Sequence, residues 1–209
     1  MKKEFLQFDK VRDNAIKLAH RIYTEGFIPD VIYVSLRGGA YLGNIISEYF
    51  KIVHKEALPC KVRRPVYYAA VVARSYNDIA KSGKVKVDGW TYSPDHLRVG
   101  DKVLLVDDIF DTGRTINHLA QIIIEKGIPR DDLKIAVHDY KFFPDKEEQL
   151  PYQPDYWCRK HEASIHDEST WIHYMSHELM GLTEEEIKTH YYSRDDSLKD
   201  ALQIMTDNK

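Results

Sequence analysis

The chain has 209 residues, enough for one ordinary domain with a full core and a modest appendage. Its 30 basic and 33 acidic residues leave a formal charge of −3, so neither a nucleic-acid surface nor a membrane surface is indicated. No apolar window is of signal-peptide or membrane-span type, which predicts a cytoplasmic protein, and Cys60 and Cys158 are too few for a disulfide framework.

The first half of the chain alternates helical and strand patterns. A helix is predicted between Asp9, the expected N-cap, and Gly26, because apolar residues recur there at helical spacing: Val11, Ala15, Leu18, Ala19 and Ile22. Residues 29–34 (PDVIYV) predict a buried strand that runs through the glycine turn SLRGG into a second helix over 41–50. Another apolar strand is predicted over 66–73, and the polar segment 74–92 after it is a long loop or a hairpin.

The second half repeats this order. Residues 103–106 (VLLV) predict a third buried strand, followed by a glycine turn and by a helix that Gly127 closes. Residues 133–140 predict a fourth strand, and irregular structure with short strands follows it. The charged C-terminal segment has a helical pattern.

Strands separated by helices of this length indicate parallel pairing with right-handed crossovers. The predicted fold class is therefore α/β, with an open, mainly parallel twisted sheet and helices on both faces. Ligands of such sheets bind beyond the carboxyl ends of the strands, and both glycine turns, SLRGG and DTGRT, lie at that edge.

The stretch VLLVDDIFDTGRT, residues 103–115, has the character of a sugar-phosphate site. The turn leads into a helix whose first amides lack internal partners, so these amides and the hydroxyls of Thr112 and Thr115 can bind a phosphate. Asp107 and Asp108 would repel a bare phosphate, but they suit vicinal sugar hydroxyls or a hydrated Mg²⁺. The alternative is an ordinary acidic turn after a buried strand.

Neither GxxxxGK[ST] nor GxGxxG occurs in the chain, which disfavours a P-loop ATPase and a dinucleotide dehydrogenase. All thirteen positions of VLLVDDIFDTGRT instead resemble the signature with which type I phosphoribosyltransferases bind 5-phosphoribosyl-1-pyrophosphate (PRPP). The resemblance implies that residues 111–115 (Asp111, Thr112, Gly113, Arg114 and Thr115) bind the 5-phosphate. It also implies that Asp107 and Asp108 hold the ribose 2- and 3-hydroxyls, with Mg²⁺ bridging those hydroxyls and the pyrophosphate.

Two further segments resemble the 6-oxopurine members of that family. SLRGG is similar to their pyrophosphate-binding loop, which makes Arg37 and Gly38 pyrophosphate ligands and implies that the peptide before Arg37 can be cis. Arg37 suits this role because a guanidinium forks well onto phosphate oxygens. Ser75 and Tyr76 resemble the pair in the mobile loop that closes over the reaction centre and excludes water. Without the resemblance, SLRGG is equally an ordinary glycine turn with an exposed arginine, and the segment of Ser75 and Tyr76 has a flexible surface hairpin as its alternative.

The resemblance places the base site after the fourth strand. Lys141 is placed like the lysine that donates to the purine 6-oxo oxygen, although HDYKFFP is not the commonest family form. Trp171 and Ile172 resemble the pair that stacks on the purine and offers main-chain groups to its substituents, although a tryptophan is by default a core residue. Where the family has a carboxylate a little further on, this chain has His177 followed by Glu178, so the preferred base is not indicated.

A zinc site was weighed for the same region, because one cysteine and four histidines occur there, but their spacings match no compact ligand pattern: Cys158, His161, His166, His173 and His177. We expect one phosphoribosyltransferase domain over 1–180, with a small base-binding hood from about 141–180, and a helical extension over 181–209. The extension resembles nothing in that family.

These observations predict a 6-oxopurine phosphoribosyltransferase of purine salvage that requires Mg²⁺ and makes a nucleoside 5-monophosphate and pyrophosphate from PRPP and hypoxanthine, guanine or xanthine. Asp111 is the expected general base, with Arg37, Ser75 and Tyr76 as the other catalytic residues. The alternatives are a type I relative for another nucleobase and a non-catalytic PRPP-binding regulator. A homo-oligomer, dimer or tetramer, is expected.

Overall fold

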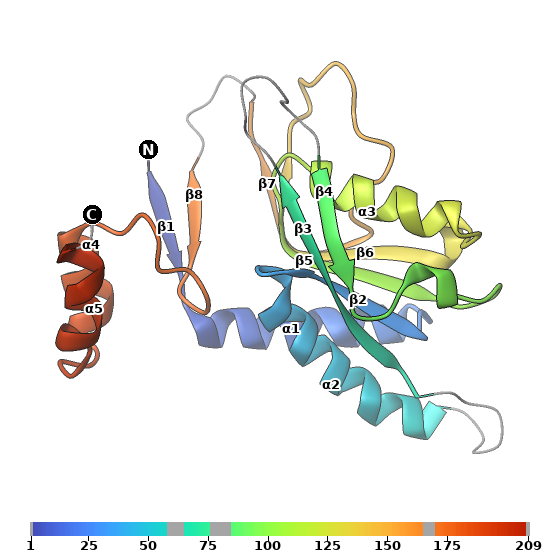
Figure 1. Ribbon diagram of the computed structural model, residues 1–209, viewed down its shortest axis with the longest axis horizontal. Helices are drawn as coiled ribbons and strands as arrows, with labels where there is room; N and C mark the ends of the chain where they lie inside the picture. The colour runs from blue at the N-terminus through green and yellow to red at the C-terminus, as the bar shows by residue number, and fades with distance from the viewer. Residues whose placement is uncertain (1, 58–64, 76–84, 165–169, 208–209) are drawn as a thin grey trace. The chain divides into compact units, whose positions relative to one another are not determined.

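The computed structural model describes residues 2–57, 65–75, 85–164 and 170–207 (Figure 1). They form two compact units, residues 1–176 and 177–209. The strands of the first unit are β1 (Lys3–Leu6), β2 (Val31–Leu36), β3 (Tyr67–Ser75), β4 (Val85–Trp90), β5 (Val103–Phe110), β6 (Leu133–Phe142), β7 (Tyr156–Glu162) and β8 (Trp171–Tyr174). Its α-helices are α1 (Phe8–Thr24), α2 (Gly39–Ala57) and α3 (Arg114–Glu125), and its short 3₁₀ turns are η1 (Pro94–His96) and η2 (Arg130–Asp132).

Six strands form one open sheet in the order β4-β3-β2-β5-β6-β7. All neighbours in it are parallel except β3 and β4, which are antiparallel. The aliphatic runs of β2 and β5 lie in the middle, with Val31 beside Val103 and Val34 beside Val106. Runs without polar alternation are typical of parallel strands that are buried on both faces. The predicted fold class is confirmed.

Helices cover both faces of this sheet (Figure 1). On one face, α1 and α2 pack their apolar stripes against alternate residues of the central strands, such as Ile32, Leu104 and Ala136. On the other face, α3 packs against the intervening residues, such as Tyr33 and Leu105. The period of two along each strand thus divides the core into two layers.

A second, two-stranded sheet consists of β1 and β8, which pair in parallel with Phe5 beside His173 and Leu6 beside Tyr174. We call this pair of strands the hood sheet. The sequence interpretation expected short strands near β8 but no strand at residues 3–6. The partners in this pairing are separated by most of the chain, so local patterns do not reveal it.

Several helix and strand boundaries differ from the predicted ones. The expectation that Asp9 caps the first helix was wrong: Gln7 is the N-cap, and Asp9 lies in the first turn, where the helix dipole favours a carboxylate. The second helix, expected over 41–50, extends over Gly39–Ala57, and the strand expected at 29–34 is Val31–Leu36. The polar segment after β3 contains β4, which pairs back onto β3, so the hairpin alternative is confirmed.

The second unit contains α4 (Glu184–Ile187), the π-helical η3 (Lys188–Tyr192) and α5 (Leu198–Asp207), as the helical pattern predicted. Thr183 begins α4 with a capping box in which its side chain accepts from the amide of Glu186. Among the described residues of the whole chain, no helix combines the length and apolar character that a membrane span requires.

Candidate functional site

Three neighbouring strands bring predicted site residues to one edge of the large sheet. Because β2, β5 and β6 are parallel and adjacent, their carboxyl ends lie together. Arg37 follows β2, Asp107 and Asp108 lie near the end of β5, and Lys141 lies near the end of β6. The sheet order thus gathers residues from three separate motifs.

The turn after β5 has the geometry of an anion-binding loop. Gly113 is the N-cap of α3 and has a φ of 75°, a conformation that favours glycine. A side chain at this position would also strike the ring of Phe110, which lies directly beneath it. No side chain among the described residues caps α3, so its first amides face the loop. A cavity of about 200 Å³ lies there, lined by residues 107–109 and 111–116.

A buried asparagine braces this loop, and sequence reasoning missed it. Asn117 donates its amide to the carbonyl oxygens of Gly113, at 3.0 Å, and Tyr152, at 2.8 Å. Its own carbonyl oxygen accepts from the amide of Tyr152 at 2.9 Å. The turn after β5 is therefore tied through Asn117 to the segment between β6 and β7.

The glycine turn after β2 lies directly against the acidic pair. The Leu36–Arg37 peptide is cis, as the resemblance allowed, and the side chain of Arg37 is exposed. A Cβ atom on Gly38 would lie 2.2–2.4 Å from the carboxylate atoms of Asp108. Glycine at this position lets the turn after β2 lie directly against the Asp108 side chain.

The two carboxylates differ in their surroundings. Burial raises the pKa of the Asp107 carboxyl well above its usual range, and the neighbouring charge of Asp108 raises it further. A hydrogen bond from the buried Ser35 at the end of β2 opposes this shift in pKa. An acidic pair of this kind is stabilised by hydroxyl donors or by a cation, and carboxylate oxygens are the ligands that Mg²⁺ prefers. The residues present therefore fit a magnesium ion, held directly or through sugar hydroxyls.

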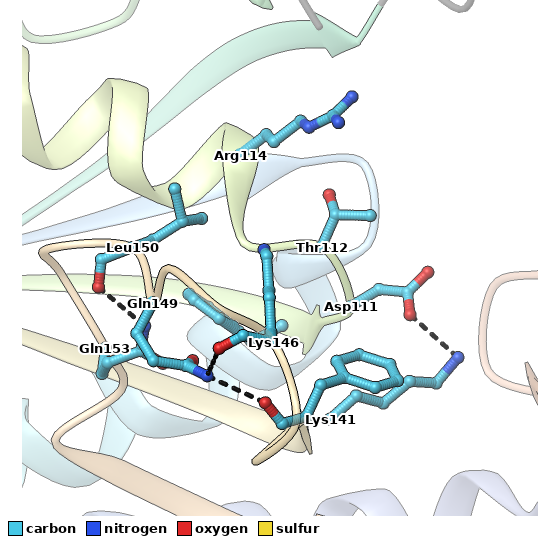
Figure 2. A pocket seen from close by; sticks show the side chains of 10 residues that line it. Asp111, Thr112, Arg114, Lys141, Lys146, Gln149, Leu150 and Gln153 are labelled. Carbon is cyan, nitrogen blue, oxygen red and sulfur yellow. Dashed lines mark hydrogen bonds and ion pairs between the residues drawn. The ribbon is translucent and has the colours of Figure 1, made fainter. Parts of the chain in front are cut away.

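Lys141 and Asp111 form an ion pair at this edge. The Nζ atom of Lys141 lies 2.9 Å from Oδ1 of Asp111; the lysine side chain is 12% exposed and the aspartate side chain 54%. Figure 2 shows Lys141 extending toward Asp111, and both side chains line a second cavity of about 180 Å³. Lys146, Gln149 and Gln153, from the segment after β6, line the rest of that cavity.

The other predicted site residues that the structure describes lie in the hood sheet, at the end of β3 and in the second unit. Ile172 is buried in the hood sheet, whereas Trp171 is 46% exposed, so the default expectation of a core tryptophan is wrong for it. Ser75 is the last residue of β3, and Tyr76 lies outside the described residues. His177 and Glu178 belong to the second unit.

A buried polar cluster on β6 was also missed, because the pattern LKIAVHDY was interpreted only as an apolar strand. It is centred on Asp139, whose side chain is fully buried and contacts His138, Arg159, His161 and Tyr174. Within the described part of the chain, no three histidine, cysteine, aspartate or glutamate side chains are arranged to hold a metal ion. His166, one of the residues weighed for zinc, lies outside that part.

Comparison with known proteins gives matches over most of the chain. The model of the phosphoribosyl transferase domain matches residues 2–168. A curated relative, the Bifunctional protein PyrR of Halalkalibacterium halodurans, is 26% identical over 161 residues, which are 75% of this chain and 82% of the relative.

Solved structures share the fold. The purine phosphoribosyltransferase from Pyrococcus horikoshii superposes with a TM-score of 0.62 at 20% identity, covering 88% of this chain and all of the other. A hypoxanthine phosphoribosyltransferase from Staphylococcus aureus gives a TM-score of 0.53 at 15% identity, covering 75% of this chain and 76% of the other.

Proposed function

Because the chain belongs to the phosphoribosyl transferase domain family, we propose that it transfers the 5-phosphoribosyl group from PRPP to a 6-oxopurine base. The products are the nucleoside 5-monophosphate and pyrophosphate, and the base is hypoxanthine, guanine or xanthine. The proposal assigns the protein to purine salvage, and a cytoplasmic homo-oligomer remains our expectation. The domain division at residue 180 likewise remains a prediction.

The observation that carries the choice of a 6-oxopurine is the pairing of Lys141 with Asp111. A 6-oxopurine presents its O6 acceptor and its N7 position side by side on one edge. An ammonium donor 2.9 Å from a carboxylate acceptor matches that edge when N7 carries the proton. In this proposal Lys141 donates to O6, Asp111 accepts from N7, Trp171 stacks on the ring, and Ile172 offers main-chain groups to its substituents.

The other end of the site accommodates PRPP. The amides and hydroxyls of residues 111–115 bind the 5-phosphate at the start of α3, where the helix dipole favours an anion. Asp107 and Asp108 accept from the ribose hydroxyls. Arg37 and the close backbone of Gly38 bind the pyrophosphate, and the segment of Ser75 and Tyr76 covers the reaction centre.

The reaction is a substitution at the anomeric carbon of ribose. The bond from that carbon to the pyrophosphate oxygen breaks with its electron pair, N9 of the base forms the new bond, and Asp111 accepts the N7 proton. When bound, Mg²⁺ supplies positive charge to the leaving pyrophosphate. Asp107 and Asp108 stabilise the positive charge that develops on the ribosyl group, and such electrostatic stabilisation is commonly the largest contribution to catalysis.

A PRPP-binding regulator is the second candidate, and the relative that is described as bifunctional favours keeping it. Release of pyrophosphate from PRPP, measured with a panel of purine and pyrimidine bases with and without Mg²⁺, separates the candidates. Turnover confined to 6-oxopurines supports the proposal. Turnover of another base would assign that base as the substrate in place of a 6-oxopurine. PRPP binding without turnover of any base supports the regulator.

Thr115→Ala is expected to weaken PRPP binding, because a hydroxyl donor to the 5-phosphate is lost. A hydrogen bond to a charged group contributes about 1.5 to 3 kcal/mol, equivalent to a ten- to hundredfold change in Kd. Isothermal titration calorimetry with PRPP measures the change. Thr24→Ala, at the far end of α1, is the control and leaves the Kd unchanged. An unaltered affinity in Thr115→Ala contradicts this placement of the phosphate.

Trp171→Ala is expected to raise the purine KM about five- to hundredfold, because stacking of a base on an aromatic ring contributes about 1–3 kcal/mol. The Kd for PRPP and the melting temperature change little, since Trp171 is half exposed. Trp171→Phe keeps an aromatic face and serves as the matched control. Equal losses for both substrates in steady-state kinetics show that Trp171 does not act as a stacking platform.

A further inference from the structure

The Asp139 carboxylate has a complete set of hydrogen-bond donors inside the protein. Its Oδ1 atom accepts from Nε of Arg159 and Nε2 of His161, each at 2.6 Å. Its Oδ2 atom accepts from Nδ1 of His138 at 2.7 Å and from the hydroxyl of Tyr174 at 2.6 Å. If the buried carboxylate lost one of these donors, its negative charge would be only partly compensated. The cluster therefore strongly favours the geometry in which all four donors contact Asp139.

The cluster joins both strands of the hood sheet to the large sheet. Tyr174 is the last residue of β8, and its hydroxyl also lies 3.1 Å from the carbonyl oxygen of Asp108. Arg159, on β7, forms an ion pair through Nη1 with Glu4 of β1. On the other side, Nε2 of His138 contacts the side-chain amide of Asn14 in α1 at 3.0 Å.

The cluster lies next to the proposed base site. Asp139 precedes Lys141 by two residues on β6, so their side chains emerge on the same face of the sheet. Its neighbour across the sheet is Ile109 of β5. The side chain of Ile109 packs against an apolar cluster that includes Ile172 and Tyr174 of the hood sheet. A displacement of β8 would therefore alter the space between Lys141 and the hood sheet.

We propose that Asp139 and Tyr174 are positioning residues, which dock β8 against the large sheet and so hold Trp171 and Ile172 in place for the base. This inference rests on the proposed function of the site. Neither residue contacts the reacting atoms: Asp139 acts through Tyr174, and Tyr174 acts through the strand that carries the stacking pair. Loss of the tie makes the undocked hood sheet more populated, and the apparent affinity for the base falls in proportion to the docked fraction.

Tyr174→Phe tests the tie, because it removes one hydroxyl and keeps the ring. We expect the KM for the base to rise by at most about tenfold, the limit set by losing one hydrogen bond to a charged group, while kcat at saturating base and the Kd for PRPP stay within about twofold. A general loss of folding would lower kcat and PRPP binding as well, so the split between the parameters separates the two effects.

Tyr92→Phe is the control. Tyr92 stacks on Tyr67 at the start of β3, so it lies at the edge of the large sheet opposite to the proposed site, and its hydroxyl donates to the carbonyl oxygen of His96 at 3.0 Å. This variant also loses one hydroxyl hydrogen bond, but it touches neither the hood sheet nor the cavity beside Lys141. We expect an unchanged KM for the base. A KM that rises equally in both variants overturns the proposal.

Amide hydrogen exchange gives a readout that is independent of activity. We expect the amides of residues 171–174 to exchange about tenfold faster in Tyr174→Phe than in the parent and in Tyr92→Phe, because local opening controls exchange. Unchanged exchange overturns the docking role, whatever the kinetics. If the parent turns over no purine, the proposed function is wrong, and the exchange experiment still decides whether Tyr174 docks β8.

Discussion

Asp111→Asn is expected to lower kcat by about 10²- to 10⁴-fold, equivalent to roughly 3 to 5.5 kcal/mol of activation free energy, because a positioned general base is lost. PRPP should still bind within a few-fold of the parent. Asparagine is nearly isosteric with aspartate and keeps a carbonyl acceptor, so the turn that begins α3 keeps its shape. Steady-state rates beside calorimetric PRPP binding measure the two effects.

The ion pair with Lys141 supplies the control for this experiment. Lys141→Gln breaks the same pair but keeps the Asp111 carboxylate, so it should mainly raise the KM for the base and lower kcat much less. Should Asp111→Asn instead turn over at the rate of the parent, Asp111 is not the base. Equal losses of kcat in both variants would mean that catalysis needs the intact ion pair, which contradicts a separate role of Asp111 as the general base.

Gly38→Ala is expected to weaken PRPP binding by about a hundredfold or more. The added methyl group would lie 2.2–2.4 Å from the Asp108 carboxylate, so that side chain must turn away from the ribose hydroxyls. The loss of two hydrogen bonds to a charged group is of this order. The same methyl group also holds the pyrophosphate away from the backbone of the loop. Calorimetric titration with PRPP measures the change.

Gly89→Ala is the matched control, because a Cβ atom at that position in β4 meets nothing within 4 Å. It should bind PRPP as the parent does. Melting temperatures of both variants show whether each protein is folded. A folded Gly38→Ala protein with the affinity of the parent would mean that the turn after β2 does not approach the PRPP site.

The strand, turn and helix start that contain the proposed phosphate site were predictable from the sequence because their information is local. A buried strand, two carboxylates, a glycine with positive φ and a helix start follow one another within residues 103–115. The parallel sheet was predictable for a similar reason, since aliphatic runs and helical periods alternate along the chain.

Contacts between distant residues were not predictable. The pairing of β1 with β8 and the approach of Gly38 to Asp108 depend on the order of strands in space. The buried Asp139 cluster draws its partners from β6, β7 and β8, and each of them has an ordinary polar neighbourhood in the sequence. The N-cap at Gln7 was missed because it carries no side-chain capping bond, so no residue type marks it.

The position of β5 between β2 and β6 has a consequence for how such a protein can diverge. Under the proposed function, the groups that bind PRPP come from β2, from β5 and from the turn after β5, whereas the groups that face the base come mainly from β6 and from the hood sheet, with Asp111 of that turn shared between the two. Substitutions on the β6 side can therefore change the choice of base while the groups that recognise the ribosyl donor are retained. Under that function, donor recognition and acceptor choice depend largely on different strands, so one scaffold can serve enzymes for different bases.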